Sequence, residues 1–134
     1  MPESNTAVIR GIYDAFGAGD GAGALGRMSP DIVWNEAENN PWADGNPYIG
    51  PESVARGIFA RCASEWDGFS ITVEELIGAG DKVVMLGRYG GRCKATGKTQ
   101  NTQAVHVWTV QDGLAVRFQQ YADTLQISLV MGLV

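Results

Sequence analysis

The chain has few of the side chains from which metal sites and disulfide frameworks are built. Its 134 residues include one histidine, His106, and two cysteines, Cys62 and Cys93. The cysteines belong to separate predicted elements, so we expect reduced thiols rather than a disulfide framework. A lone histidine without neighbouring cysteines provides no cluster of metal ligands. We therefore expect no metal site and no cofactor.

Basic clusters and long apolar runs are also missing from the sequence. The formal net charge is −5 at pH 7, and this acidic balance disfavours binding to nucleic acid or to an anionic membrane. No uninterrupted apolar run is long enough to span a bilayer. The first six residues are polar and lack the basic start and apolar core of a signal peptide, which predicts a cytoplasmic protein.

Helical spacing of apolar residues marks the first half of the chain. Such residues recur over 8–16, where Asn5 or Thr6 precedes them as a candidate cap. Asp20 is placed to cap a short second helix that ends near Met28. Pro51 opens a third helix. An apolar stripe along this third helix consists of Val54, Ile58, Cys62 and Trp66.

Alternating residues predict strands at 32–36, 69–77 and 83–93, followed by a long hairpin over residues 104–123. Residues 37–50 form an irregular loop, and loops of this length are often functional lids. A short helix is expected after Asp123. Helices followed by a mostly antiparallel sheet are typical of the α+β class. The length predicts a single domain over residues 1–134.

The turn of the hairpin decides which face His106 occupies, because a shift of one residue reverses every side chain. A two-residue turn at Asp112-Gly113 would place His106 with the outer residues of the second strand. A three-residue loop, Gln111-Asp112-Gly113, would place His106 and Trp108 on one coherent apolar face. We favour the three-residue loop, although Trp108 above Arg117 makes the first register acceptable.

Several short motifs, in this order and spacing, resemble one superfamily. They are Tyr13–Asp20, Asp31–Glu36, Tyr48–Glu52, Thr96–Lys98, Val105–Trp108, Asp112-Gly113 and Tyr121–Thr124. The chain is similar to the nuclear transport factor 2-like superfamily, and within it to ketosteroid isomerase-related and SnoaL-like polyketide cyclase proteins. This resemblance implies a cone-shaped cystatin-like fold, in which a curved, mostly antiparallel sheet wraps around three helices from the N-terminal half. It implies no single reaction, because the scaffold hosts many.

The resemblance also implies candidate catalytic residues. Glu36 falls where the isomerases carry their general base, and His106 falls where an acid holds the developing oxyanion. The oxyanion tyrosine of the isomerases corresponds to Ile12, so Tyr13 is displaced by about 100° around the helix. Asp123 corresponds to the acid/base aspartate of SnoaL-like cyclases.

Each candidate also has a purely structural interpretation. Glu36 shares a strand face with Trp34, where burial would raise its pKa toward neutrality, but a strand-end glutamate can also face solvent. His106 is either a donor to substrate, a partner of Glu36, or a core histidine bonded to a backbone carbonyl. Asp123 is equally suited to capping the helix that follows it, and Tyr13 to amphipathic packing.

Aromatic residues are the candidate lining of a ligand pocket. They are Trp34, Trp42, Tyr48, Trp108 and Phe118. We expect a small cofactor-independent enzyme that acts on an apolar carbonyl compound by proton transfer, of the isomerase or cyclase type. Glu36 would be the base, His106 the donor to a developing enolate, and Tyr13 or Asp123 would assist.

The alternative is a dimer that binds a small apolar ligand without turnover, and a third possibility is an interaction module with a structural cavity. The family usually dimerises through the outer face of the sheet, so we expect a homodimer. The candidate outer surface consists of Val105, Val107, Thr109, Gln119 and Tyr121.

Overall fold

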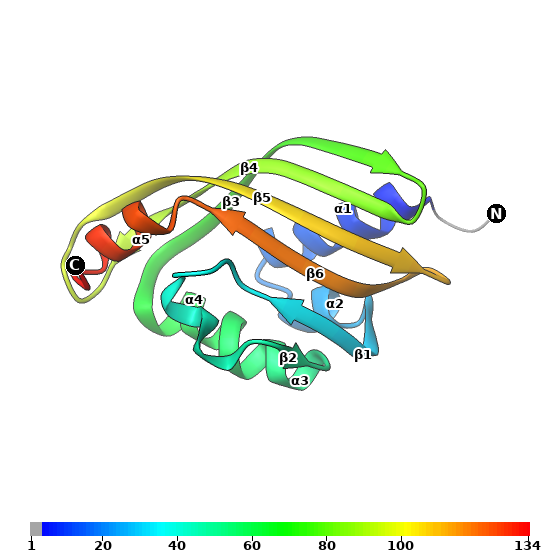
Figure 1. Cartoon of the computed structure of the whole chain (residues 1–134), viewed down its shortest axis with the longest axis horizontal. Helices are drawn as coiled ribbons and strands as arrows, with labels where there is room; N and C mark the ends of the chain where they lie inside the picture. Colours follow the sequence, from blue (N-terminus) through cyan, green and yellow to red (C-terminus); the bar gives the residue numbers. More distant parts are fainter. Residues whose placement is uncertain (1–3) are drawn as a thin grey trace.

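The structure, a computed structural model that describes residues 4–134, is built on one curved sheet of six strands in the order β2-β1-β6-β5-β4-β3. The strands are β1 (Met28–Asn35), β2 (Tyr48–Ile49), β3 (Trp66–Ala79), β4 (Lys82–Cys93), β5 (Thr99–Gln111) and β6 (Leu114–Ala122). Only β1 and β6 pair in parallel, and every other pair is antiparallel. The predicted α+β class and mostly antiparallel sheet are confirmed (Figure 1).

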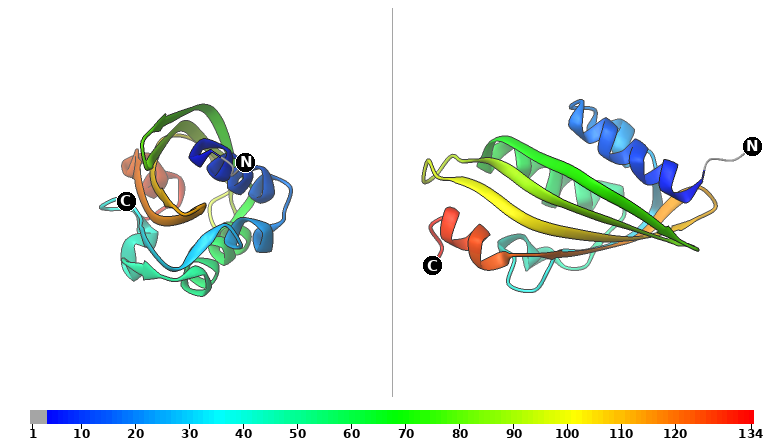
Figure 2. Two further views of the ribbon diagram at one scale, coloured as in Figure 1. Left: turned by 90° about the vertical axis from the view of Figure 1, so that its right-hand side faces the viewer. Right: turned by 90° about the horizontal axis from the view of Figure 1, so that it is seen from above.

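Two groups of helices lie inside the curve of the sheet, which wraps partly around them (Figure 2). The first group is α1 (Asn5–Gly17) and α2 (Gly21–Leu25). The second is one continuous helix made of α3 (Pro51–Val54), the π-helical turn η2 (Ala55–Phe59) and α4 (Ala60–Glu65). Their buried apolar residues form one cluster with those of β1, β4, β5 and β6. This arrangement gives the cone that the resemblance implied.

The helix ends differ in detail from the expectation. Ser4 caps α1 by accepting a hydrogen bond from the Ala7 amide, so the predicted caps Asn5 and Thr6 are wrong by one or two residues. Asp20 caps α2 as predicted. That helix ends at Leu25 rather than near Met28, because Met28 already begins β1. The polar start of the chain, from which a cytoplasmic location was predicted, lies partly in residues 1–3, outside the described residues.

The loop over residues 37–50 contains the 3-10 helix η1 (Pro41–Gly45) and the short edge strand β2. The helix α5 (Thr124–Val130) follows β6 and packs beside the turn that joins β4 to β5 (Figure 1). The Thr96 hydroxyl in that turn donates to the Val130 carbonyl at 2.6 Å. Because β1 and β6 run parallel, the 37–50 loop and α5 begin at the same end of the sheet.

The hairpin of β5 and β6 combines the two registers that the sequence left open. Its turn is the two-residue kind, because Gln111 pairs with Leu114 and both Asp112 and Gly113 have positive φ, as a type I′ turn requires. The predicted three-residue loop is therefore wrong. A β-bulge follows, in which Val116 is the extra residue between the pairs Val110–Ala115 and Thr109–Arg117.

That bulge restores the face on which His106 was predicted. Beyond it, Trp108 pairs with Phe118 and His106 pairs with Gln120, so these four side chains point into the cone and all are buried. Phe118 in turn pairs with Trp34 across the parallel strands, and their rings stack with centroids 3.7 Å apart. The inward row of the sheet thus brings the candidate residues of three strands together.

Candidate functional site

A cavity lies between the inner face of the sheet and the two groups of helices. Its volume is about 60 Å³, several times what a single water molecule needs. Ten of its 21 lining residues are aromatic. The aromatic lining residues are Tyr13, Phe16, Trp34, Trp42, Phe59, Trp66, Phe69, Tyr89, Trp108 and Phe118. Five polar residues also line it, namely Glu36, Asn40, Gln100, His106 and Gln120. A wall of this composition suits an apolar ligand that is oriented by few polar contacts.

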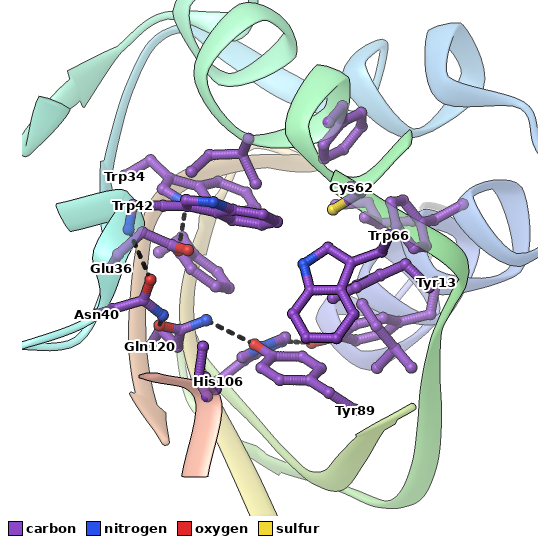
Figure 3. Close-up of a pocket in the computed structure, with 18 of the residues that line it drawn as sticks. Tyr13, Trp34, Glu36, Asn40, Trp42, Cys62, Trp66, Tyr89, His106 and Gln120 are labelled. Atoms are coloured by element: carbon purple, nitrogen blue, oxygen red, sulfur yellow. Dashed lines mark hydrogen bonds between the residues drawn. The ribbon is translucent and has the colours of Figure 1, made fainter. Parts of the chain in front are cut away.

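Glu36 follows directly after β1, and its carboxyl group belongs to the cavity (Figure 3). The side chain is only 3% exposed. Burial raises its pKa from the ordinary 4.5 to about 7, although a hydrogen bond from Trp34 and the charge of Arg61 both act to lower it. The Trp34 indole N–H donates to Glu36 Oε2 at 2.9 Å. A carboxyl group with this pKa can both accept and return a proton near neutral pH.

The 37–50 loop holds the backbone of Glu36 in place. Asn46 pairs with it twice, since its Oδ1 accepts from the Glu36 amide and its Nδ2 donates to the Glu36 carbonyl, each at 2.9 Å. Arg61 on α4 forms a two-point ion pair with Asp44 in η1, with both distances 3.0 Å. The loop is thus fastened to α4 at one point and to the end of β1 at another.

His106 lies deep in the cavity, and both of its ring nitrogens are hydrogen-bonded to phenols. Nδ1 is 2.6 Å from the Tyr13 hydroxyl, and Nε2 is bonded to the Tyr89 hydroxyl. Burial lowers the pKa of His106 from 6.5 to about 3, so the ring is neutral at physiological pH. Burial also raises the pKa of both phenols, which keeps them protonated.

Tyr13 therefore reaches the cavity, despite its displacement around α1. Its hydroxyl accepts a hydrogen bond from the Trp108 indole at 2.8 Å. The ring contacts of His106 match neither the predicted pair with Glu36 nor the structural alternative, a bond to a backbone carbonyl. We refer to Tyr13, His106 and Tyr89 below as the phenol–imidazole chain.

Tyr89 and Gln120 were not among the residues that the sequence singled out. The Gln120 amide donates to the Tyr89 hydroxyl at 2.7 Å, while its oxygen accepts from Asn40 at 2.8 Å and from the Ala37 amide at 3.1 Å. Gln120 thereby links the phenol–imidazole chain to the segment that follows Glu36 (Figure 3). A signal existed for both, because Tyr89 alternates with Val83 and Met85, and Gln120 with Phe118, along the inward faces of their strands.

The remaining candidates divide into two groups. Trp34, Trp42, Trp108 and Phe118 line the cavity, as the sequence predicted. Tyr48 and Asp123 do not line it. Tyr48, in β2, donates to the Trp42 carbonyl at 2.6 Å. Asp123 caps α5 by accepting from the Gln126 amide, so its structural interpretation describes it and it is not part of the candidate site.

Within residues 4–134, no group of three or more His, Cys, Asp or Glu side chains is arranged to hold a metal ion. No helix in this described range has both the length and the apolar character that crossing a membrane requires. Cys62 and Cys93 are both buried free thiols.

Comparisons with known proteins agree with this architecture. A protein with this fold from Burkholderia thailandensis E264, described as NTF2-like, is 32% identical over 96% of this chain and 98% of its own, with a TM-score of 0.92. The structure of TerC co-crystallised with polyporic acid is 27% identical over 96% and 98% of the two chains, with a TM-score of 0.85. Comparison with curated proteins gave no significant match.

A third structure, from Jannaschia sp. CCS1, is provisionally described as a SnoaL-like polyketide cyclase. It is 18% identical over 98% of this chain and 96% of its own, with a TM-score of 0.80. This level of identity shows the fold alone. The family model of the SnoaL-like domain matches residues 9–118. From this match and the cone-shaped structure, we conclude that the chain belongs to the SnoaL-like domain family and has the NTF2-like fold.

Proposed function

We propose that the protein is a cofactor-independent enzyme that acts on a small apolar carbonyl compound by proton transfer, as an isomerase or a cyclase does. The observation that carries this proposal is Glu36, a carboxyl group with a pKa of about 7 inside an aromatic cavity. Burial is the cause of the raised pKa of Glu36, and a pKa near neutrality suits a general base at neutral pH.

In this proposal Glu36 removes a proton from the carbon next to the substrate carbonyl. The electron pair moves to the carbonyl oxygen, which becomes an enolate oxygen, and Glu36 then returns the proton to a different atom of the substrate. General base catalysis of this kind contributes roughly 10²- to 10⁴-fold to a rate. The aromatic wall excludes water, so that any hydrogen bond to the enolate oxygen is strengthened.

The donor to the enolate oxygen is a phenol of the phenol–imidazole chain rather than His106 itself. Both nitrogens of His106 are occupied by Tyr13 and Tyr89, whereas both phenols line the cavity. His106 therefore acts through the tyrosines, and we assign it a positioning role. The SnoaL-like family membership and the co-crystallisation of TerC, a protein with this fold, with polyporic acid support a small organic molecule as the ligand.

Deuterium exchange tests the proposal. A panel of small enolisable cyclic ketones is incubated with the protein in heavy water, and carbon–deuterium exchange is followed by NMR. We expect exchange that rises with pH through about 7, since the base must be ionised. Glu36→Gln should remove it, whereas Glu38→Gln, a change at an exposed neighbour, should leave it intact. Equal exchange in wild type and Glu36→Gln would exclude Glu36 as the base.

The apolar wall also supports a second function, in which the protein binds a small apolar molecule without changing it. Ten aromatic side chains around one cavity give such a ligand a large contact area. Binding of a ketone without exchange at any pH would favour this second function over the first. In either case we propose a small apolar molecule as the ligand and a homodimer as the assembly.

A further inference from the structure

The phenol–imidazole chain is flanked on both sides by groups that only donate hydrogen bonds to it. The Trp108 indole N–H donates to the Tyr13 oxygen at 2.8 Å, and the Gln120 amide donates to the Tyr89 oxygen at 2.7 Å. Between them stand two links, one from each phenol to a nitrogen of His106. All of these side chains are buried, so each proton in the chain can be followed.

The number of protons in the chain exceeds the number of links by one. A neutral histidine carries one ring proton, and each phenol carries one, so three protons serve two links. Each link uses a single proton, because one partner donates and the other accepts. One phenol proton therefore has no acceptor within the phenol–imidazole chain, and the N–H groups of Trp108 and Gln120 cannot accept it.

The tautomer of His106 decides which phenol holds the unused proton. If the ring proton is on Nε2, it is donated to Tyr89, Tyr13 donates to Nδ1, and the Tyr89 proton is unused. If the ring proton is on Nδ1, the roles are reversed and the Tyr13 proton is unused. Among residues 4–134, no hydrogen bond takes either phenol proton to an acceptor other than His106, and both phenols line the cavity.

We propose that the phenol–imidazole chain is a subsite for a ligand oxygen, to which it presents one O–H donor from either Tyr13 or Tyr89 according to the tautomer of His106. The ligand is an oxygen acceptor, either a carbonyl oxygen or the oxyanion of an enolate or phenolate. The subsite deepens the proposed function and rests on it for the view that a carbonyl compound enters the cavity. The donor count itself does not depend on Glu36.

Two tyrosine variants separate a switchable donor from a fixed one. In Tyr13→Phe, two protons remain for one link, and donation from Nε2 to Tyr89 leaves the Tyr89 proton for the ligand. In Tyr89→Phe, donation from Nδ1 to Tyr13 leaves the Tyr13 proton. Each single variant therefore keeps one donor but fixes His106 in an opposite tautomer. The double variant has neither phenol.

The test measures binding of 4-nitrophenol, whose absorption also reports whether it is bound as the phenol or the phenolate. It is carried out at pH 6, where Glu36 is largely neutral. We expect each single variant to bind within about tenfold of wild type, and the double variant to bind roughly 10- to 100-fold more weakly than either single variant. Gln103→Ala, at an exposed position on the same strand as His106, is the control for nonspecific loss.

Nitrogen-15 NMR of the labelled histidine provides the second readout, which a merely structural role would not change. We expect the Nε2–H tautomer in Tyr13→Phe and the Nδ1–H tautomer in Tyr89→Phe. The same tautomer in both variants, or a single variant as weak in binding as the double variant, would overturn the proposal, because one phenol would then be a fixed donor. These results are independent of deuterium exchange, so failure of Glu36 as a base is recognised separately.

Discussion

Glu36 and His106 are the two buried titratable groups on which the candidate site is centred. Their pKa values are shifted in opposite directions. Both are 3% exposed, and in both cases burial penalises the charged form. The carboxyl group of Glu36 has one side-chain hydrogen bond from Trp34 and a pKa raised to about 7. The ring of His106 is bonded at both nitrogens and has a pKa lowered to about 3.

This difference shows how one physical cause assigns two roles. Desolvation moves the pKa of an acid up and that of a base down. For Glu36 the shift brings the pKa into the neutral range, where the carboxyl group can gain and lose a proton. For His106 the shift removes it from that range, so the ring can only connect its neighbours. The following changes test the contrast, beginning with the largest expected effect.

Replacing His106 should cost the most stability. His106→Leu leaves the hydroxyls of Tyr13 and Tyr89 without their shared partner in a buried site, and we expect a loss of about 4 kcal/mol in the free energy of unfolding. Urea unfolding measures it. Gln103→Leu, an exposed position on β5, should change stability by less than about 0.5 kcal/mol. A similarly small change in stability for His106→Leu would show that the phenol–imidazole chain does not stabilise the fold.

The pH dependence of stability should reveal Glu36. In the unfolded chain Glu36 loses its proton near pH 4.5, whereas in the folded protein it keeps it until about pH 7. Raising the pH through this window therefore favours unfolding. Relative to Glu36→Gln, wild type should lose about 3 kcal/mol of stability between these two pH values.

Wild type must be compared with Glu36→Gln because His106 changes the pH dependence of stability in the opposite direction. Its folded pKa of about 3 lies below the ordinary 6.5, so its contribution to stability rises with pH across that interval. In wild type the two effects offset each other between about pH 4.5 and 6.5. A constant difference between wild type and Glu36→Gln across this range would show that the Glu36 pKa is not raised.

Asn46 should have an intermediate effect, because it acts on the Glu36 backbone rather than on its carboxyl group. Asn46→Ala removes both hydrogen bonds to that backbone, and we expect a loss of about 2 kcal/mol in stability. The rate of deuterium exchange should also fall, with a change in the pH midpoint of its rising limb. An unchanged midpoint and rate would show that Asn46 supports the loop without positioning Glu36.

The smallest effect is expected outside the cavity. Asp123→Ala removes the cap of α5, which should cost about 1 kcal/mol, while deuterium exchange stays at the wild-type rate. Asp123→Asn should keep most of the stability, since asparagine caps helices as well as aspartate does. Loss of exchange in Asp123→Asn with stability retained would return Asp123 to the candidate catalytic residues.

The sequence predicted the parts of the site that depend on local periodicity. Alternation placed Trp34 and Glu36 on one face of the strand predicted at 32–36, and the apolar character of that face made its direction clear. The inward direction of His106 was predicted from the same reasoning, even though the turn was not the one expected. A row of apolar residues identifies the buried face of a strand more securely than it identifies a turn.

The phenol–imidazole chain could not be predicted because its members come from separate elements. Tyr13 lies on α1, Tyr89 on β4 and His106 on β5, and a tyrosine in an amphipathic segment is ordinary. Only the tertiary register, in which His106 stands opposite Gln120 and Met85, brings these hydroxyls to one imidazole. Asn46 escaped notice for a different reason: it bonds the backbone of Glu36, and a backbone partner leaves no signal in residue type.

The bulge at Val116 has a consequence for how this protein can be altered. It lies between the turn and the inward row of side chains, so the turn at Asp112-Gly113 and the direction of His106 are set by separate pieces of sequence. An engineer can exchange the two-residue turn for another of equal length without disturbing the part of the hairpin that lines the cavity. Deleting the one bulged residue, by contrast, would shift the register of β5 against β6 by one residue, so that the inward side chains of one strand would point outward.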